Sequence, residues 1–214
     1  MANPNKNALP HFFKPVFTAL LAAFIVLLTF TVGSLRIGPI TITLNCLPVA
    51  IGAVLMGPLY GAILGLVFGL SSFFASFTSA SLTTILVSVN PFLTFLMCVV
   101  PRVICGWVPG LLFQKLPQKT ALGRFAGSSL CCALVTALNT IGFLGWMWIF
   151  FHDAFTSNSD VIAKIGSQPT GSIFLFIFAL AGFNALIEII VNLVLGTAIC
   201  KALFAVTKNK GNTA

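Results

Sequence analysis

Charged side chains are scarce in this chain. Of 214 residues only 7% are Asp, Glu, Lys or Arg, and only three are acidic. A soluble domain carries about 25% charged residues, so this scarcity excludes an ordinary soluble fold. Instead 58% of the residues are hydrophobic and the mean hydropathy is +1.09. Several apolar runs reach the roughly 20 residues that cross a bilayer. The composition therefore predicts an all-α polytopic membrane protein, with residues 1–214 forming a single integral membrane domain.

Motifs that carry catalysis or nucleotide binding are missing. The chain has no G-x-x-x-x-G-K-[ST], no H-E-x-x-H and no G-x-S-x-G. These absences exclude a P-loop ATPase, a zincin and an α/β-hydrolase. The paired intramembrane acids of a proton pump are also missing, and the apolar segments show no three-plus-three duplication of the kind found in many secondary transporters. We expect no cofactor and no enzyme activity, and a small membrane transferase is disfavoured for the same reason.

Cysteine is present without a metal-binding or disulfide pattern. The chain has no C-x-x-C, and its two histidines, His11 and His152, are remote in sequence from most of the cysteines. All six cysteines lie in apolar runs: Cys46, Cys98, Cys105, Cys131, Cys132 and Cys200. Buried cysteine behaves as a small apolar residue. We therefore predict packing roles and no metal site.

Six apolar segments are predicted to form the membrane domain. They cover about residues 15–34, 45–56, 59–77, 90–113, 121–151 and 172–206. The second is short for a full crossing, and Gly57-Pro58 marks a turn after it. Three glycines at intervals of four then follow on one helix face, a spacing that brings backbones together: Gly61, Gly65 and Gly69. This pattern predicts a tight hairpin of short helices. Residues 78–89 and 152–171 are predicted as loops.

Positive charge is distributed unevenly between the two predicted ends of the bundle. Eight basic residues fall on the side of the termini: Lys6, Lys14, Lys115, Lys119, Arg124, Lys201, Lys208 and Lys210. The other side carries Arg36 and Lys164. The positive-inside rule places both termini in the cytoplasm. The net charge of +8 is thereby explained without nucleic acid.

A few polar residues are predicted at mid-membrane depth. Arg102, Asn139 and Asn184 each lie about 12 residues, or roughly 17 Å, from the outer end of their segments. Glu188 lies one turn below Asn184 on the same face. Charges at this depth cost several kcal/mol, about 2.5 to 3.5 on insertion scales. Two hypotheses follow: these side chains line a ligand cavity, or Arg102 and Glu188 form an internal ion pair.

Three further polar residues are candidates for the outer mouth of such a cavity. Asn45 and Asn90 open the second and fourth segments, where they can either meet ligand or act as helix N-caps. Arg36 lies in the loop of residues 35–44. It offers a second site for an anion if Arg102 only forms an ion pair with Glu188.

Five stretches of the chain carry a family resemblance: GPITIT at 38–43, LPVAIGAVLMGPLYGAILGLVFGLSS at 47–72, NP at 90–91, PRVICG at 101–106 and FNALIE at 183–188. With them the chain resembles the substrate-binding S-components of energy-coupling factor (ECF) vitamin transporters, most closely the pantothenate type. In the pantothenate-type pattern a histidine often precedes the Leu-Pro of the second segment, and here that position is Cys46.

The resemblance implies a six-helix bundle in the cell membrane that captures a small water-soluble vitamin, with pantothenate first. Riboflavin, folate or a thiamine precursor is the alternative, and a second function class is an assembly or sensory partner without transport. The implied partners are a transmembrane coupling protein and two ATPases. S-components usually dock through alanines of the first helix, which Ala19 and Ala23 match; the other interpretation of this pair is ordinary packing.

Overall fold

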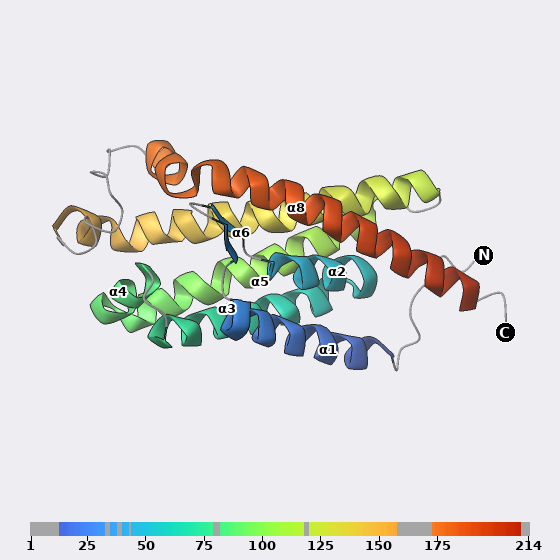
Figure 1. Cartoon of the computed structure of the whole chain (residues 1–214), viewed down its shortest axis with the longest axis horizontal. Coiled ribbons are helices and arrows are strands. Elements are labelled where there is room, and N and C mark those ends of the chain that lie inside the picture. The colour runs from blue at the N-terminus through green and yellow to red at the C-terminus, as the bar shows by residue number, and fades with distance from the viewer. Residues whose placement is uncertain are drawn as a thin grey trace.

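The computed structural model describes residues 13–32, 35–37, 40–42, 44–78, 82–117, 120–157 and 173–210. The side chains of residues 32, 35–42, 82, 121, 152–157, 173–185 and 205–210 lie outside this description. Figure 1 shows an elongated bundle whose long helices run roughly along one axis, with the start of the first helix and the end of the last helix at the same end.

Long apolar helices make up most of the bundle. They are α1 (Phe13–Leu27), α3 (Pro58–Thr78), α5 (Pro91–Lys115), α6 (Ala121–Ser157) and α8 (Ile173–Lys210). A π-helical turn, η1 (Leu28–Val32), extends α1. In the described residues five helical stretches are long and apolar enough to cross a membrane. The predicted segments thus match the long helices to within a few residues, except that α6 continues beyond 151 to Ser157.

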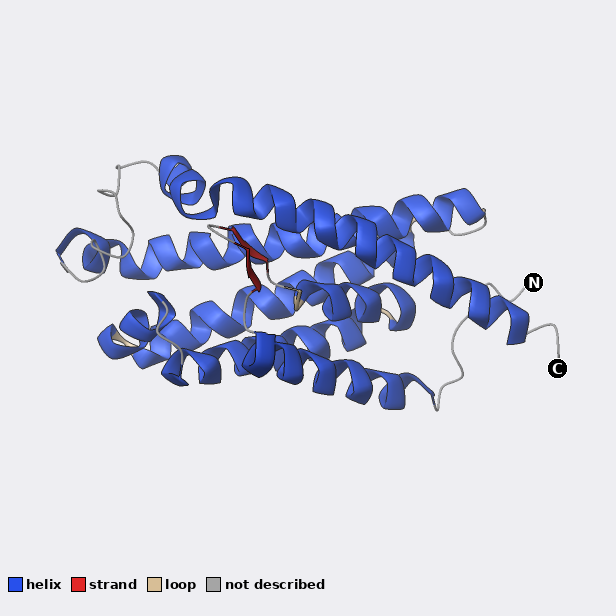
Figure 2. Ribbon diagram, in the orientation of Figure 1, coloured by secondary structure: helices blue, strands red, loops and turns tan. Residues whose placement is uncertain are grey.

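The segment between α1 and α3 departs most from the prediction. Part of the predicted loop of residues 35–44 forms an antiparallel ribbon of β1 (Leu35–Ile37) and β2 (Ile40–Ile42), in which Arg36 pairs with Thr41. The described fold is therefore helical, as predicted, with one small ribbon that was not predicted (Figure 2). After the ribbon, α2 (Cys46–Met56) has only 11 residues. At 1.5 Å per residue it is about 16 Å long, half of a hydrocarbon core of about 30 Å.

Contacts along α1 show where the short helix begins. The Thr18 hydroxyl, near the start of α1, lies 3.2 Å from Met56 Sδ at the end of α2. Asn45, just before α2, donates a hydrogen bond to Thr29 near the start of η1, which follows α1. The two helices are therefore antiparallel, and α2 begins inside the bundle. The prediction that Asn45 opens its helix at the outer surface is wrong, because the ribbon and not the helix supplies the outer part of this segment.

Glycine allows α3 and α5 to pack with their backbones nearly touching. A Cβ added at Gly65 would collide with the backbone carbonyl of Arg102, and one added at Gly69 would lie 2.8 Å from Val99 Cα. Gly61 and Gly106 face each other in the same way. The glycines at intervals of four therefore do pack helices together, as predicted, and α5 rather than α2 is the closest partner along most of this seam.

A second correction concerns the predicted loop of residues 78–89. Its second half forms a short helix, α4 (Leu82–Val89), which precedes α5. Leu86 of α4 is fully buried and packs in one cluster with Met97, Cys98 and Met147. The Ser/Thr content of this stretch suggested a loop, but its apolar residues are close enough together to cover the end of the bundle.

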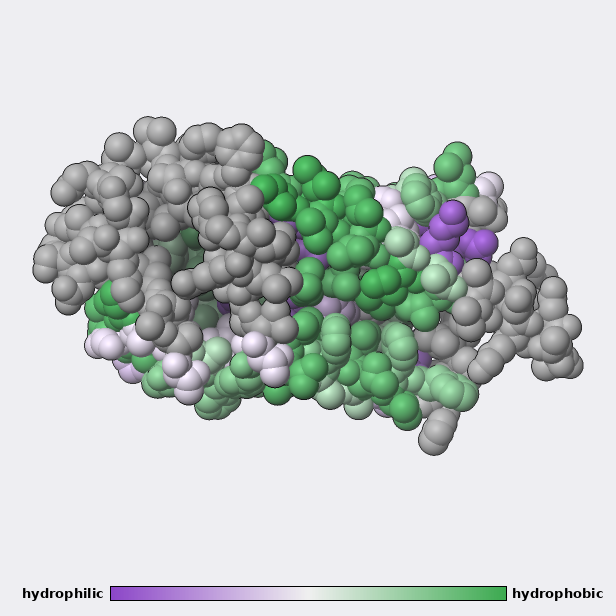
Figure 3. All heavy atoms as spheres, in the orientation of Figure 1, coloured by the Kyte–Doolittle hydropathy of each residue, from purple (hydrophilic) through white to green (hydrophobic). Residues whose placement is uncertain are grey.

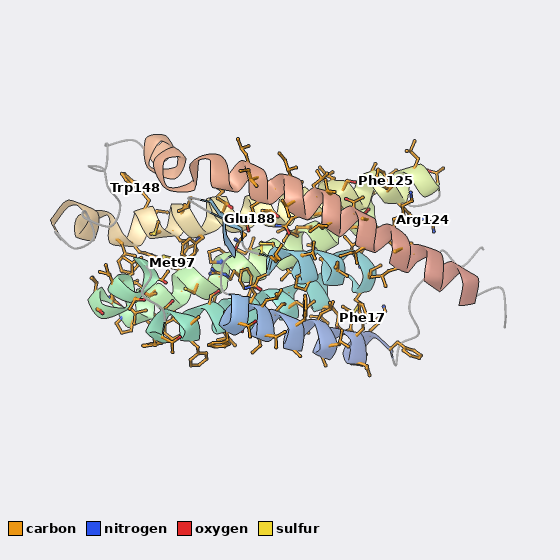
Figure 4. All side chains as sticks on the ribbon, in the orientation of Figure 1. Phe17, Met97, Arg124, Phe125, Trp148 and Glu188 are labelled. Carbon is orange, nitrogen blue, oxygen red and sulfur yellow. The ribbon has the colours of Figure 1, made fainter. Side chains whose placement is uncertain are left out.

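The surface is organised as a membrane protein requires. Apolar side chains cover the middle of the described surface, and hydrophilic ones gather toward the end where α1 begins and α8 ends (Figure 3). Arg124 and Phe125 mark that end of α6 in Figure 4. Lys201 of α8 lies beside them, with Nζ 6.0 Å from the Phe125 ring centroid. Described basic residues of α6 and α8 thus share one end of the bundle.

Candidate functional site

Arg102 lies inside the bundle, in the middle of α5. It is 8% exposed. Its Nη1 donates to the Cys98 carbonyl at 2.7 Å, and its Cζ lies 4.6 Å from the Phe68 ring centroid and 5.0 Å from that of Phe143. The described contacts of the guanidinium therefore include one carbonyl and two ring faces. Such rings stabilise a desolvated cation through cation–π attraction.

The Nε of Arg102 is buried and has no hydrogen-bond partner. A charged donor without a partner is costly away from water. The predicted ion pair with Glu188 is not among the contacts of Arg102 in the described part of the chain. One edge of the guanidinium therefore retains a donor for an external acceptor.

The packing of α6 against α5 places Asn139 at the depth of Arg102. The Cys131 thiol donates to the Pro109 carbonyl at 3.2 Å. Farther along, a Cβ on Gly142 would lie 2.9 Å from Pro101 Cβ. Two antiparallel helices with these contacts bring residues 139–141 level with Arg102. Asn139 Oδ1 is buried without a hydrogen-bond partner.

The packing of α8 against α6 places Glu188 at the same depth. Thr197 donates to Ser129 at 3.1 Å, and a Cβ on Gly196 would lie 2.7 Å from Cys132 Sγ. Counting eight residues back from Gly196 on α8 and eight forward from Cys132 on α6 sets Glu188 level with Thr140, next to Asn139, because the two helices run antiparallel (Figure 1). Figure 4 places Glu188 near the middle of the long axis, beside the ribbon.

The start of α2 supplies the fourth side of this site. Cys46 is fully buried and lies within electrostatic range of both Glu188 and Arg102. The N-terminus of α2 therefore points into the same region. A helix N-terminus carries a partial positive charge of about half a unit and unpaired N–H groups. The site thus combines one guanidinium, one carboxylate, side-chain amides and a helix N-terminus.

Unsatisfied polar atoms are concentrated around this region. Among the side chains that the structure describes, the buried atoms without a hydrogen-bond partner are Asn45 Oδ1, Arg102 Nε, Asn139 Oδ1, Asn192 Oδ1 and Asn192 Nδ2. Each such atom costs about 1 to 3 kcal/mol. These atoms belong to α5, α6, α8 and the residue before α2, and the levels of Arg102 and Asn192 differ by about one helical turn. A polar molecule bound between these elements would therefore recover much of this cost. We call Arg102, Asn139, Glu188, Asn192 and the start of α2 the central polar cluster.

The predicted site residues do not all lie in the same place in the structure. It brings Arg102, Asn139 and Glu188 together. The Asn90 side chain accepts from the backbone N–H groups of Phe92 and Leu93 and is therefore a helix N-cap. Asn45 has no side-chain cap hydrogen bond, so the N-cap interpretation does not hold for it.

Two other predicted site residues have side chains outside the described set. The backbone of Asn184 lies in α8, one turn from Glu188, and the backbone of Arg36 lies in β1. Their roles remain predictions. Asn192 was missed from sequence, although it follows Asn184 and Glu188 at intervals of four on the same helix face.

The cysteines pack as expected from the sequence. All six are buried free thiols. Among the described residues no group of three or more His, Cys, Asp or Glu side chains is arranged to hold a metal ion. Cys46, Cys98 and Cys105 line the surroundings of Arg102, where the compact, weakly polar thiols add no further charge.

A bundle of apolar helices around a buried, partly unsatisfied polar cluster defines a membrane-embedded binding protein for a small polar molecule. Residues 14–200 match the model of the family described as ECF transporter, substrate-specific component. The chain belongs to this family. It is thus a multi-pass membrane protein and the substrate-binding subunit of an ECF transporter, associates with an ECF module, and is not itself catalytic.

Two curated relatives extend the comparison. The pantothenic acid transporter PanT of Lactococcus lactis subsp. cremoris is 30% identical over 213 residues, covering 91% of this chain and 95% of that protein. The pantothenate transporter PanT of Leuconostoc mesenteroides subsp. mesenteroides is 26% identical over 164 residues, covering 76% of this chain and 75% of that protein.

Proposed function

We propose that this S-component captures pantothenate and delivers it to an ECF module for ATP-driven uptake. The names of the two PanT relatives support the choice of substrate. The observation that carries it in this chain is the buried Arg102, whose Nε lacks a partner. Pantothenate has one carboxylate, one amide and two hydroxyl groups. This set matches a site with one arginine and several amides.

The carboxylate is assigned to Arg102. A guanidinium binds a carboxylate through parallel hydrogen bonds, and these charge-assisted bonds are about twice as strong as neutral ones. Contacts with the Phe68 and Phe143 rings restrict the guanidinium before ligand arrives. Asn139 and Asn184 are assigned to the amide and hydroxyl groups, since a carboxamide both donates and accepts.

Glu188, Arg36, Asn45 and Asn90 have supporting roles in this proposal. Glu188 accepts from ligand hydroxyls and offsets the charge of Arg102. Arg36 belongs to the ribbon beyond the cluster and attracts the anion as it enters. Asn45 positions the start of α2 through its 3.0 Å hydrogen bond to Thr29, and Asn90 caps α5 at the outer end.

Binding to the purified chain tests the function. Titration calorimetry in detergent is expected to give a pantothenate Kd below 1 μM, which corresponds to at least about 8 kcal/mol of binding free energy. Riboflavin, folate and a thiamine precursor serve as competitors, and tighter binding of one of them would reassign the substrate. If no vitamin binds, the capture function is wrong and a sensory or assembly role takes its place.

The path of the chain supports six crossings in a single membrane domain of residues 1–214. Thr18 meets Met56 and Thr29 meets Asn45, so α1 and α2 are antiparallel. Since α3 follows α2 after Gly57 and runs parallel to α1 (Figure 1), the ribbon and α2 together make one return crossing. We propose that both termini lie in the cytoplasm, since basic residues gather at their end.

Docking to the coupling protein is assigned to α1. Ala19 and Ala23 are exposed, as are their neighbours Leu20 and Phe24. An exposed small-xxx-small pair allows a partner helix to approach closely, and its exposure disfavours the interpretation that it packs inside this chain. The proposed partners are one transmembrane coupling protein and two ATPase subunits, which supply the energy that this chain lacks.

A further inference from the structure

Asn192 is the most completely buried amide of the central polar cluster. It is 1% exposed, and neither its oxygen nor its nitrogen has a hydrogen-bond partner. It lies on the same face of α8 as Glu188 and Gly196, four residues from each. A carboxamide can accept two hydrogen bonds and donate two, so this side chain leaves its whole capacity unused.

The surroundings of Asn192 are defined by the same helix pairing that places Glu188. Gly196 packs on Cys132, and one turn farther along both helices Asn192 comes level with Thr136. Thr136 is fully buried, and its hydroxyl donates to the Cys132 carbonyl at 3.2 Å, which leaves its oxygen lone pairs available. Leu47 of α2 also contacts the Gly196 position, so the start of α2 borders this level.

We infer that Asn192, with Thr136 facing it, is a second ligand subsite that binds the uncharged polar end of the substrate. This inference rests on the proposed function. With the carboxylate at Arg102, a substrate extending one helical turn along the α6–α8 interface brings its hydroxyl groups to Asn192. The turn is about 5.4 Å long, a distance that a short acyl chain spans.

The effect of replacing Asn192 on the stability of the empty protein distinguishes a ligand-binding asparagine from a structural one. In the empty protein the Asn192 amide contributes nothing that offsets its desolvation, because it has no partner. Replacing it by leucine, of similar size and without polar atoms, removes that penalty. The empty protein is then expected to be as stable as wild type or more so, while ligand binding is weakened. An asparagine that held α8 in place would show the opposite pattern.

The experiment compares wild type with Asn192→Leu in detergent, using pantothenate and its analogue without the two hydroxyl groups. Thermal unfolding reports the stability of each empty protein, and calorimetry reports each Kd. The inference expects an unchanged or higher Tm without ligand and a Kd for pantothenate at least 10-fold weaker. For the analogue, the two proteins are expected to have the same Kd. Thr136→Val is expected to weaken pantothenate binding in the same direction.

A matched control uses Thr197, which is also buried on α8 but bonds Ser129. Thr197→Val is expected to lower the Tm and leave both Kd values unchanged. Equal pantothenate binding by wild type and Asn192→Leu would overturn the subsite and leave the proposed function standing. A lower Tm of empty Asn192→Leu with equal loss for both ligands would assign Asn192 a structural role. Wild type that binds no pantothenate would overturn the proposed function and this inference together.

Discussion

Replacing Arg102 tests whether its guanidinium binds the substrate carboxylate. One of its five N–H groups is committed to the Cys98 carbonyl at 2.7 Å, and Nε has no partner. Arg102→Lys keeps the charge and loses the planar fork. The loss of one charge-assisted hydrogen bond is expected to cost about 1.5 to 3 kcal/mol, which corresponds to a Kd roughly 10- to 150-fold weaker.

Lysine also loses the flat contact with Phe68 and Phe143, but a cation remains between the two rings. The folded state is therefore expected to survive this substitution better than Arg102→Met. Arg124→Met is the matched control, because Arg124 also lies over a ring, 5.9 Å from the Phe204 centroid, at the far end of the bundle. This control is expected to bind pantothenate as wild type does.

The assay is calorimetry on Arg102→Lys, Arg102→Met, Glu188→Gln and the Met/Gln double variant, with pantothenate and an uncharged amide of pantothenate. If Arg102 binds the carboxylate, the uncharged ligand loses little further affinity on the lysine variant. If Arg102 serves only to neutralise Glu188, removing both charges restores folding and affinity. A folded double variant that binds pantothenate normally would refute the carboxylate assignment and direct attention to Arg36.

Three further predictions address packing, docking and the substrate pocket. Gly65→Ala places a methyl group against the Arg102 carbonyl and is expected to lower stability by about 1 to 3 kcal/mol, seen as a lower Tm, whereas Gly145→Ala, where a Cβ meets nothing within 4 Å, is not expected to destabilise. Substituting Ala19 and Ala23 together by leucine is expected to abolish uptake in cells carrying the ECF module and to leave pantothenate binding intact; loss of both would mean that the pair packs internally. Cys46→Leu adds volume beside Arg102 and Glu188 and is expected to weaken binding at least 10-fold, about 1.4 kcal/mol, while Cys46→Ser stays near wild type; equal affinities would place the ligand away from α2.

The long helices could be predicted from sequence because hydropathy alone determines them. An apolar run of about 20 residues in lipid must satisfy its backbone internally, and a helix does so. The predicted ends at 59–77 and 90–113 lie within two residues of α3 and α5. The glycines at intervals of four also identified a close helix contact, since only glycine permits it.

The central polar cluster was only partly predictable. Depth counted along each segment brought Arg102, Asn139 and Glu188 together, because that count needs only the helix rise. The short α2 was predicted at 45–56, close to its observed bounds. The ribbon and the buried start of α2 were missed, because a short apolar segment after β-branched residues does not reveal how deep its helix begins. Asn45 and Asn192 depend on that depth and on helix pairing, which no local pattern encodes.

The two halves of the bundle differ in how they are held together, and this difference accounts for the site. Along α3 and α5 the glycines bring backbones into contact and bury Arg102 between rings of both α3 and α6. The α3–α5 interface can keep the Arg102 side chain in a fixed position because close backbone contact between the two helices gives many favourable dispersion contacts. Along α6 and α8 the Asn139 Oδ1 atom and both polar atoms of the Asn192 amide are buried without hydrogen-bond partners, so the empty interface is less stable than its apolar packing alone would make it. A ligand that forms hydrogen bonds with these polar atoms offsets the cost of burying them without partners. The affinity of ligand for this interface is therefore higher than it would be if the same atoms were already hydrogen-bonded in the empty protein.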